Sequence, residues 1–109
     1  MEPMEKLFQI LNGNYADYEI EYRIHATRRM FQRNIHENDV ETVLKEGKVI
    51  AQYDDDLPSP SFLINGIGYG NRPLHVVVAL NSIENILVII TAYRPDPIKW
   101  TKQFTRRVK

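Results

Sequence analysis

The spacing of the apolar residues changes at Gly47, and this change limits the possible folds more than any other feature of the chain. Between residues 25 and 46 apolar side chains recur every three or four positions, as on one face of a helix. From Lys48 onward they alternate with polar residues or run together, as in strands. Helices followed by strands are typical of an α+β fold. We therefore expect N-terminal helices packed on one face of a four- to five-stranded antiparallel sheet that forms a meander.

Two helices are predicted before the change of period. The first covers residues 25–33 and ends at Asn34, and the second runs to Glu46. Gly47 follows where a left-handed C-cap is common. A shorter helix at residues 4–11 and a strand at residues 18–24 are expected before them. The apolar stripes of the two main helices consist of Ala26, Met30, Val40, Val43 and Leu44.

The second half of the chain predicts a series of strands. They are expected at residues 48–53, 61–65, 73–80 and 86–93. Three glycines between the second and the third mark a hairpin: Gly66, Gly68 and Gly70. The last strand is apolar on both faces, which predicts an interior position in the sheet. From Trp100 onward the chain is basic, and we expect a short helix there.

The length and composition indicate one domain. A chain of 109 residues has room for a single core. We divide it into a helical extension at 1–17, a core at 18–100 and a basic tail at 101–109. The chain has no cysteine, its longest apolar run is short, and its N-terminus does not read as a signal peptide. We therefore expect a cytoplasmic protein that does not contact a membrane and uses no cofactor.

The charges balance overall but are unevenly distributed. Fourteen basic residues face fourteen acidic ones, so no overall field attracts nucleic acid. The segment 23–33 nevertheless holds four arginines and no acid. The segment 93–109 holds six basic residues against Asp96 alone. This pattern predicts either one basic face or a mixed, solvated surface.

The first candidate site lies on the first main helix. His25, Arg29 and Arg33 follow one another at intervals of four, so they rise along one stripe. An imidazole and two guanidiniums on one stripe could bind a phosphate and transfer a proton beside it. Arg28 is a further candidate for substrate binding. A solvated helix face whose arginines cover apolar surface would have the same spacing.

Two further candidates lie on strands. His75 is expected on the face of its strand opposite Leu74 and Val76, as either a catalytic or a structural histidine. Tyr93 and Arg94 end the last strand, where a tyrosine can transfer a proton and an arginine can bind phosphate. Packing of the C-terminal tail is the alternative role for this pair. No group of residues has the spacing of a metal site.

Several of these segments together resemble a known family of small bacterial and archaeal proteins, described only as a domain of unknown function. The resemblance extends from about residue 22 to residue 100. The family is often grouped with RelE-like and BrnT-like toxins, in the broad class of ribonucleases that includes barnase. The segments that carry the resemblance are His25-Ala26-Thr27-Arg28-Arg29-Met30, Arg33-Asn34-Ile35, Asp39-Val40 to Leu44, Gly47, Arg72-Pro73-Leu74-His75-Val76-Val77, Thr91-Ala92-Tyr93-Arg94-Pro95 and Trp100.

This resemblance implies a RelE- or barnase-like fold and metal-independent cleavage of RNA. The 2′-hydroxyl would attack the adjacent phosphate, with His25 as base or acid and His75 as its counterpart. Arg29 and Arg33 would stabilise the phosphate, while Tyr93 or Arg94 would orient it. RNA and an antitoxin protein are the implied partners. A non-catalytic interaction module, or a homodimer, is the alternative, and the neutral net charge favours it.

Overall fold

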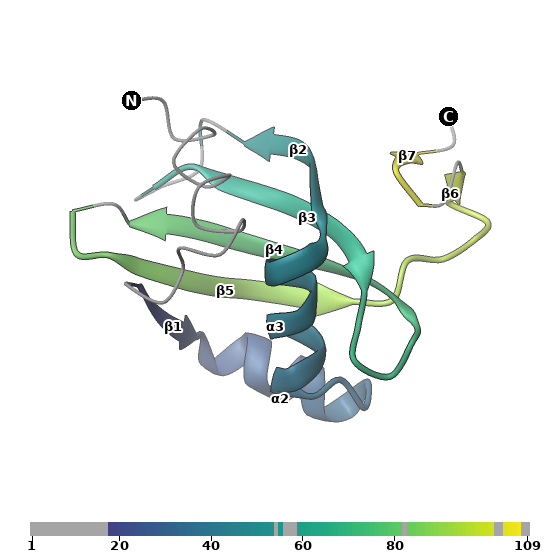
Figure 1. Cartoon of the computed structure of the whole chain (residues 1–109), viewed down its shortest axis with the longest axis horizontal. Coiled ribbons are helices and arrows are strands. Elements are labelled where there is room, and N and C mark those ends of the chain that lie inside the picture. Colours follow the sequence, from purple (N-terminus) through teal and green to yellow (C-terminus); the bar gives the residue numbers. More distant parts are fainter. Residues whose placement is uncertain (1–17, 54, 56–58, 82, 102–103, 108–109) are drawn as a thin grey trace.

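A sheet with the strand order β1-β5-β4-β3-β2 forms the centre of the computed structural model (Figure 1). The structure describes residues 18–53, 55, 59–81, 83–101 and 104–107. The helix expected at 4–11 lies outside these residues. Within them the elements follow one another as β1 (Glu19–Tyr22), α2 (Ile24–Gln32), α3 (Glu37–Glu46), β2 (Lys48–Tyr53), β3 (Ser61–Ile67), β4 (Pro73–Asn81), β5 (Ile86–Tyr93), β6 (Trp100–Thr101) and β7 (Arg106–Arg107).

Both helices cover the same face of the sheet, because each buries one apolar stripe. α2 packs on β5, and α3 packs on β3 and β4. The α+β prediction is therefore confirmed, and none of the described helices is long and apolar enough to cross a membrane. The fully buried side chains of the core include Ala26, Val40, Val43, Leu44, Phe62, Ile64, Val76, Val78, Leu87, Ile89 and Ala92.

The strands from β2 to β5 form the predicted antiparallel meander, whereas β1 departs from the prediction. β1 pairs with β5 in parallel, with Ile20 opposite Leu87. Alternating polarity predicts a strand but carries no information about its direction. A parallel pair requires a long connection between its strands, and here the whole chain from α2 to β4 lies between β1 and β5. β5 therefore has a neighbour on each side, as its two apolar faces predict.

Gly47 does not adopt the predicted left-handed conformation, because its φ is −78°. The residue is instead placed where the end of α3 meets the sheet. A Cβ atom there would lie 2.5 Å from the Val43 carbonyl oxygen and 2.8 Å from that of Asn65. Close backbone approach, and not a positive φ, therefore explains the glycine. Asn34 does end α2 in the left-handed region, with a φ of 56°.

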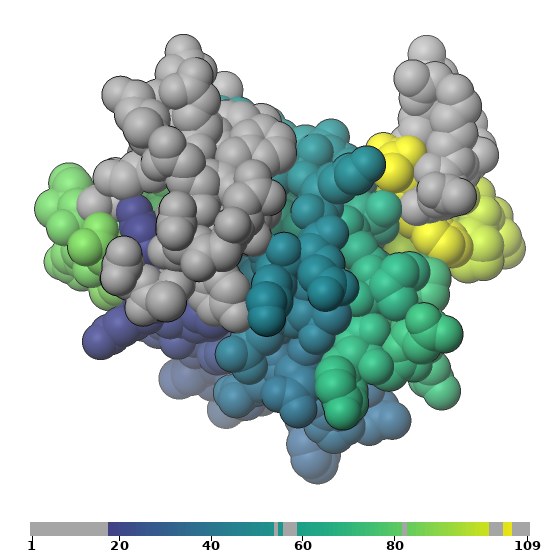
Figure 2. Space-filling model, viewed as in Figure 1, coloured from purple at the N-terminus to yellow at the C-terminus, as the bar shows by residue number. Residues whose placement is uncertain are grey.

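The described residues after β5 also do not form the short helix that was predicted from Trp100 onward. It forms a two-stranded ribbon in which Trp100 pairs with Arg107. Phe104 lies in the connecting turn with a φ of 68°. A φ in the left-handed region at this position is incompatible with a right-handed helix over the predicted segment. Figure 2 shows the described part of the ribbon, in yellow, at one end of the molecule.

Candidate functional site

A groove of about 570 Å³ opens where β5 ends and the chain turns toward the ribbon. We call it the β5 groove. Three of its residues were predicted as site residues, namely Arg33, Tyr93 and Arg94. The described residues that line it are Arg33, Tyr93, Arg94, Asp96, Lys99 and Trp100.

His75 lies directly behind the tyrosine of this groove and is completely buried. Its Nδ1 is 3.1 Å from the hydroxyl of Tyr93, and its Nε2 is 2.8 Å from the carbonyl oxygen of Phe104. A carbonyl only accepts hydrogen bonds, so Nε2 must carry the proton. Nδ1 is then an acceptor, and the phenol donates to it. The three groups form a hydrogen-bonded chain that ends at the wall of the groove.

The surroundings of His75 keep its imidazole neutral. Burial lowers the pKa of the imidazole below its ordinary value, while the hydrogen bond to Phe104 opposes this effect. The Trp100 ring meets the imidazole edge to face, with the ring centres 4.5 Å apart. A neutral, oriented imidazole can accept a proton from Tyr93. It does not reach the groove itself, so the prediction that His75 acts directly on a substrate does not fit its position.

Main-chain carbonyls fix both Arg33 and Arg94, one of β5 for Arg33 and two at the end of α2 for Arg94. Nη1 of Arg33 donates to the Ala92 carbonyl over 2.9 Å. Arg94 donates from Nη1 to the Arg33 carbonyl and from Nη2 to the Asn34 carbonyl, the latter over 3.0 Å. A guanidinium has five N–H donors, so each arginine keeps several for another acceptor. The two cations also complement the negative end of the helix dipole.

The β5 groove carries an excess of positive charge. Lys99 adds a third cation to the two arginines, and Asp96 is the acid among the described lining residues. Oδ1 of Asp96 accepts a hydrogen bond from the Ile98 amide over 2.9 Å, which holds the carboxylate in its own turn. The arrangement suits an anionic ligand whose charge is spread over several oxygen atoms.

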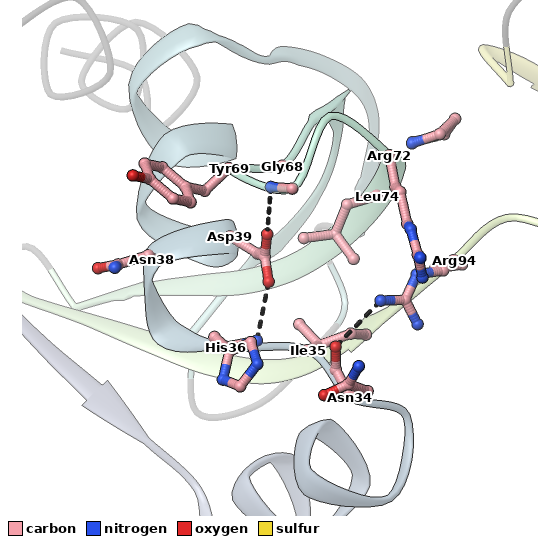
Figure 3. A pocket seen from close by; sticks show the side chains of 12 residues that line it. Asn34, Ile35, His36, Asn38, Asp39, Gly68, Tyr69, Arg72, Leu74 and Arg94 are labelled. Carbon is pink, nitrogen blue, oxygen red and sulfur yellow. Dashed lines mark hydrogen bonds between the residues drawn. The ribbon is translucent and has the colours of Figure 1, made fainter.

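A second pocket, of about 440 Å³, shares Arg94 with the β5 groove. We call it the hairpin pocket, because the β3–β4 hairpin forms one of its walls. Ile35 and Leu74 form its apolar floor, and Figure 3 shows Asp39 on one side and Arg72 with Arg94 on the other. Within the described part of the chain, the Arg72 guanidinium makes no hydrogen bond or ion pair.

Asp39 joins α3 to the hairpin. Its Oδ2 accepts from the His36 amide over 2.9 Å, and its Oδ1 accepts from the Gly70 amide over 3.0 Å. Burial alone would raise the pKa of this carboxyl, but the two amides and the nearby charges of His36 and Arg94 lower it overall. Gly68 permits the close approach, since a Cβ there would lie 2.9 Å from Oδ1. The carboxylate is therefore ionised and held in place.

The remaining predicted residues lie along the exposed side of α2. His25, Arg28 and Arg29 are exposed, and none of them lines the β5 groove or the hairpin pocket. Eight residues separate His25 from Arg33, which corresponds to about 12 Å along a helix. The structure thus gathers Arg33, Tyr93 and Arg94 and separates His25 from them. The catalytic role of His25 stays a prediction.

Two features of the site were missed from the sequence. Lys99 was counted only among the basic residues of the segment 93–109, and Asp39 only as part of a helix start. The spacing of Asp39 after His36 matches a capping box, which could have indicated its fixed carboxylate. Its bond to Gly70 spans 31 residues and has no signal in the sequence. Among the described residues, no three histidine, aspartate or glutamate side chains gather as metal ligands would.

Comparison with known proteins gives one match. A family model described as a domain of unknown function (DUF4258) matches residues 22–94. No curated protein and no solved structure matches the chain. The matched range includes α2, α3 and the strands β2 to β5, and it ends at Arg94 in the β5 groove.

Proposed function

Because the chain belongs to the DUF4258 family of domains of unknown function, we propose its function from the β5 groove: a toxin-like, metal-independent RNA endonuclease. The single observation that carries the proposal is the hydrogen-bonded chain from Tyr93 through His75 to the Phe104 carbonyl. It reaches a groove whose other walls bear Arg33, Arg94 and Lys99. An acid–base group beside fixed cations is what cleavage of a phosphodiester requires.

The proposed reaction uses the phenol of Tyr93 as the group that exchanges protons with RNA. The 2′-hydroxyl attacks the adjacent phosphorus, and its proton passes to the phenol while the phenolic proton passes to Nδ1 of His75. The proton then returns through Tyr93 to the leaving 5′-oxygen. The products are a 2′,3′-cyclic phosphate and a 5′-hydroxyl. His75 is a positioning residue in this scheme, oriented by the Phe104 carbonyl.

The cations of the groove would bind the reacting phosphate. Arg33 and Arg94 keep free N–H donors although carbonyls hold them, so they can face the charge that develops on the phosphorane. The partly exposed Trp100 offers a face on which a base could stack. A local excess of cations supports this role although the whole chain is neutral.

The test is cleavage of a labelled single-stranded RNA by the purified full chain. We expect Tyr93→Phe to lower the rate about 100-fold or more, because it removes the proton-exchanging hydroxyl. Lys99→Ala should weaken RNA binding and lower its salt dependence, because the variant loses one phosphate contact. Lys48→Ala is the matched control, since this exposed lysine starts β2 on the far edge of the sheet.

The outcomes separate the proposed site from the one expected on α2. Equal rates for the unchanged chain and for Tyr93→Phe would exclude the phenol. A loss of cleavage in His25→Ala but not in Tyr93→Phe would return the acid–base role to the exposed face of α2. No cleavage by the unchanged chain, together with no growth inhibition on expression, would remove the endonuclease proposal.

A second candidate function is a protein interaction module that forms a homodimer. Its supporting observation is a pair of exposed apolar side chains on α2: Ile24 is 70% exposed and Phe31 is 88% exposed. They are seven residues apart and therefore lie on one face of the helix. Light scattering should then give a dimer mass that Phe31→Ser converts to a monomer mass. A monomer at every concentration would exclude this function.

A further inference from the structure

The hairpin pocket presents hydrogen-bond acceptors on one wall and donors on the other. The Asp39 carboxylate faces across the floor formed by Ile35 and Leu74 toward Arg72 and Arg94 (Figure 3). The floor is apolar because both side chains are aliphatic, and both are held in the core, with Ile35 4% exposed and Leu74 2% exposed. The pocket suits a ligand that offers N–H donors to the carboxylate and, on a neighbouring edge, acceptors to the arginines.

We propose that the hairpin pocket binds a guanine base of the RNA, an inference that rests on the function proposed above. Guanine carries adjacent N–H donors at N1 and N2, which an ionised carboxylate accepts. Its O6 and N7 are acceptors that an arginine binds with two parallel hydrogen bonds. Asp39 supplies the carboxylate, while Arg72 and Arg94 supply the donors.

The ionisation of Asp39 and the unpaired guanidinium of Arg72 both fit guanine as the ligand. Asp39 is ionised, and its two oxygens each have a lone pair beyond those used by the His36 and Gly70 amides. The Arg72 guanidinium is unpaired within the described residues, so it loses no internal bond when it meets a base. The volume of about 440 Å³ lies in the range of small-molecule pockets.

The same walls discriminate against the other bases. Adenine and cytosine each place a ring nitrogen that accepts hydrogen bonds beside their amino group, and this acceptor would face the carboxylate. Uracil has one N–H donor between two carbonyl oxygens, which the carboxylate repels. Specificity therefore comes from repulsion of the wrong base as well as from bonds to guanine.

Arg94 connects the pocket to the proposed site of cleavage. It lines both the hairpin pocket and the β5 groove. The carbonyls of Arg33 and Asn34 accept hydrogen bonds from its guanidinium and hold it in place. A phosphate bound in the groove at Arg94 would thus carry a neighbouring nucleotide to the mouth of the hairpin pocket. The guanine would be next to the phosphate that is cleaved, which makes the pocket a specificity site.

The experiment measures binding of the full chain to 2′-O-methyl RNA, which cannot be cleaved by 2′-hydroxyl attack. Trinucleotides with G, A or U at the central position are compared, together with free GMP. We expect the G oligonucleotide to bind at least about tenfold more tightly than the A and U oligonucleotides. Arg72→Ala should remove this preference, whereas Lys48→Ala, which also removes an exposed positive charge, should keep it. Methyl shifts of Ile35 and Leu74 on binding of the G oligonucleotide would locate the base.

Each outcome decides one of the two proposals. Equal affinity for all three oligonucleotides, with Arg72→Ala behaving like Lys48→Ala, would overturn the guanine pocket and leave RNA binding by the groove intact. Binding of GMP without binding of any oligonucleotide would support the pocket with a free nucleotide as ligand and overturn the endonuclease. Asp39→Asn keeps an acceptor for one amide but loses the charge. If this variant remains folded by urea titration and still prefers G, the carboxylate has no role in recognition.

Discussion

The Nε2 proton of His75 is donated to the main-chain carbonyl of Phe104 over 2.8 Å, across 29 residues of sequence. This bond fastens the turn of the C-terminal ribbon to strand β4 in the middle of the sheet. Trp100 closes over the same imidazole, with ring centres 4.5 Å apart. The wall of the β5 groove beside Tyr93 therefore depends on a buried histidine that a ligand in the groove would not touch.

Replacing His75 with phenylalanine should destabilise the protein. The variant has no nitrogen to accept from the Tyr93 hydroxyl or to donate to the Phe104 carbonyl, and polar groups left unpaired in this way lose about 1–3 kcal/mol each. We expect the free energy of unfolding in urea to fall by about 2–4 kcal/mol. Tyr93→Phe removes only one of the two bonds and should lose about 1 kcal/mol. An equal loss in the two variants would show that the Phe104 contact is without effect.

The free energy of unfolding should fall below neutral pH because of His75. Burial lowers the folded-state pKa of His75 below 6.5, so the unfolded chain binds the proton more tightly. The contribution of His75 is thus fully present above pH 6.5 and is lost as the pH falls from there toward the lowered pKa. Urea titrations from pH 8 to pH 5 should show this slope. His75→Gln should remove it, while His25→Gln, which replaces an exposed histidine, should not.

A separate loss of stability is expected at lower pH from Asp39. The amides of His36 and Gly70 hold the ionised form, and the folded-state pKa is lowered from 3.8. Its contribution is therefore present above pH 3.8 and is lost as the pH falls through the lowered pKa. Asp39→Asn should flatten the stability curve below pH 4 and leave the slope from His75 unchanged. Glu84→Gln changes an exposed carboxylate in the β4–β5 turn and serves as the control.

Most of the fold could be predicted from the sequence, because its signals are local. The helical stripe of α3 depends on burial of one face, and both α3 and β2 end close to the predicted residues. Strand β5 was predicted with its observed bounds, since a β-branched run between turns has few other solutions. The parallel pairing of β1 could not be predicted, because direction depends on the path of the intervening chain.

The candidate site was less predictable, because it depends on contacts between distant residues. Tyr93 and Arg94 were identified at a strand end, but the link from Tyr93 to His75 spans 18 residues and needs the register of two strands. The i, i+4, i+8 spacing placed Arg29 and Arg33 on one stripe. Their environments differ nevertheless, since Arg33 lies beyond the last turn of α2 and bonds to Ala92.

Gly47→Ala should strongly destabilise the protein although the backbone conformation suits alanine. The added methyl group would meet main-chain oxygens of Val43 and Asn65 at 2.5 and 2.8 Å, and neither can move without shifting α3 or β3. We expect a loss of about 2–3 kcal/mol in the free energy of unfolding, as for other overpacked sites. Gly70→Ala is the matched control, since the nearest contact of its methyl group would be 3.7 Å from Asp39. A similar loss in both variants would mean that crowding by the methyl group at position 47 does not set the effect.

Tyr22→Phe should instead stabilise the protein. The hydroxyl of Tyr22 is buried and has no hydrogen-bond partner, although its ring packs against the core. Burial raises the pKa of this phenol well above its ordinary value, and the charges of Glu37 and Glu41 raise it further. Removing an unpaired buried hydroxyl should raise the free energy of unfolding by about 1 kcal/mol at pH 7.

The difference between Tyr22→Phe and the unchanged chain should grow in alkali. The raised pKa keeps the folded phenol neutral, so its contribution to stability is present below pH 10 and is lost as the pH rises further, when the unfolded chain ionises. Phenylalanine cannot ionise, and the variant should lose less stability between pH 9 and pH 11. Tyr69→Phe changes a side chain that is 75% exposed and should stay within about 0.5 kcal/mol of the unchanged chain. A destabilised Tyr22→Phe would mean that the hydroxyl has a partner in solution, in the apolar groove that it shares with Met30 and Phe31.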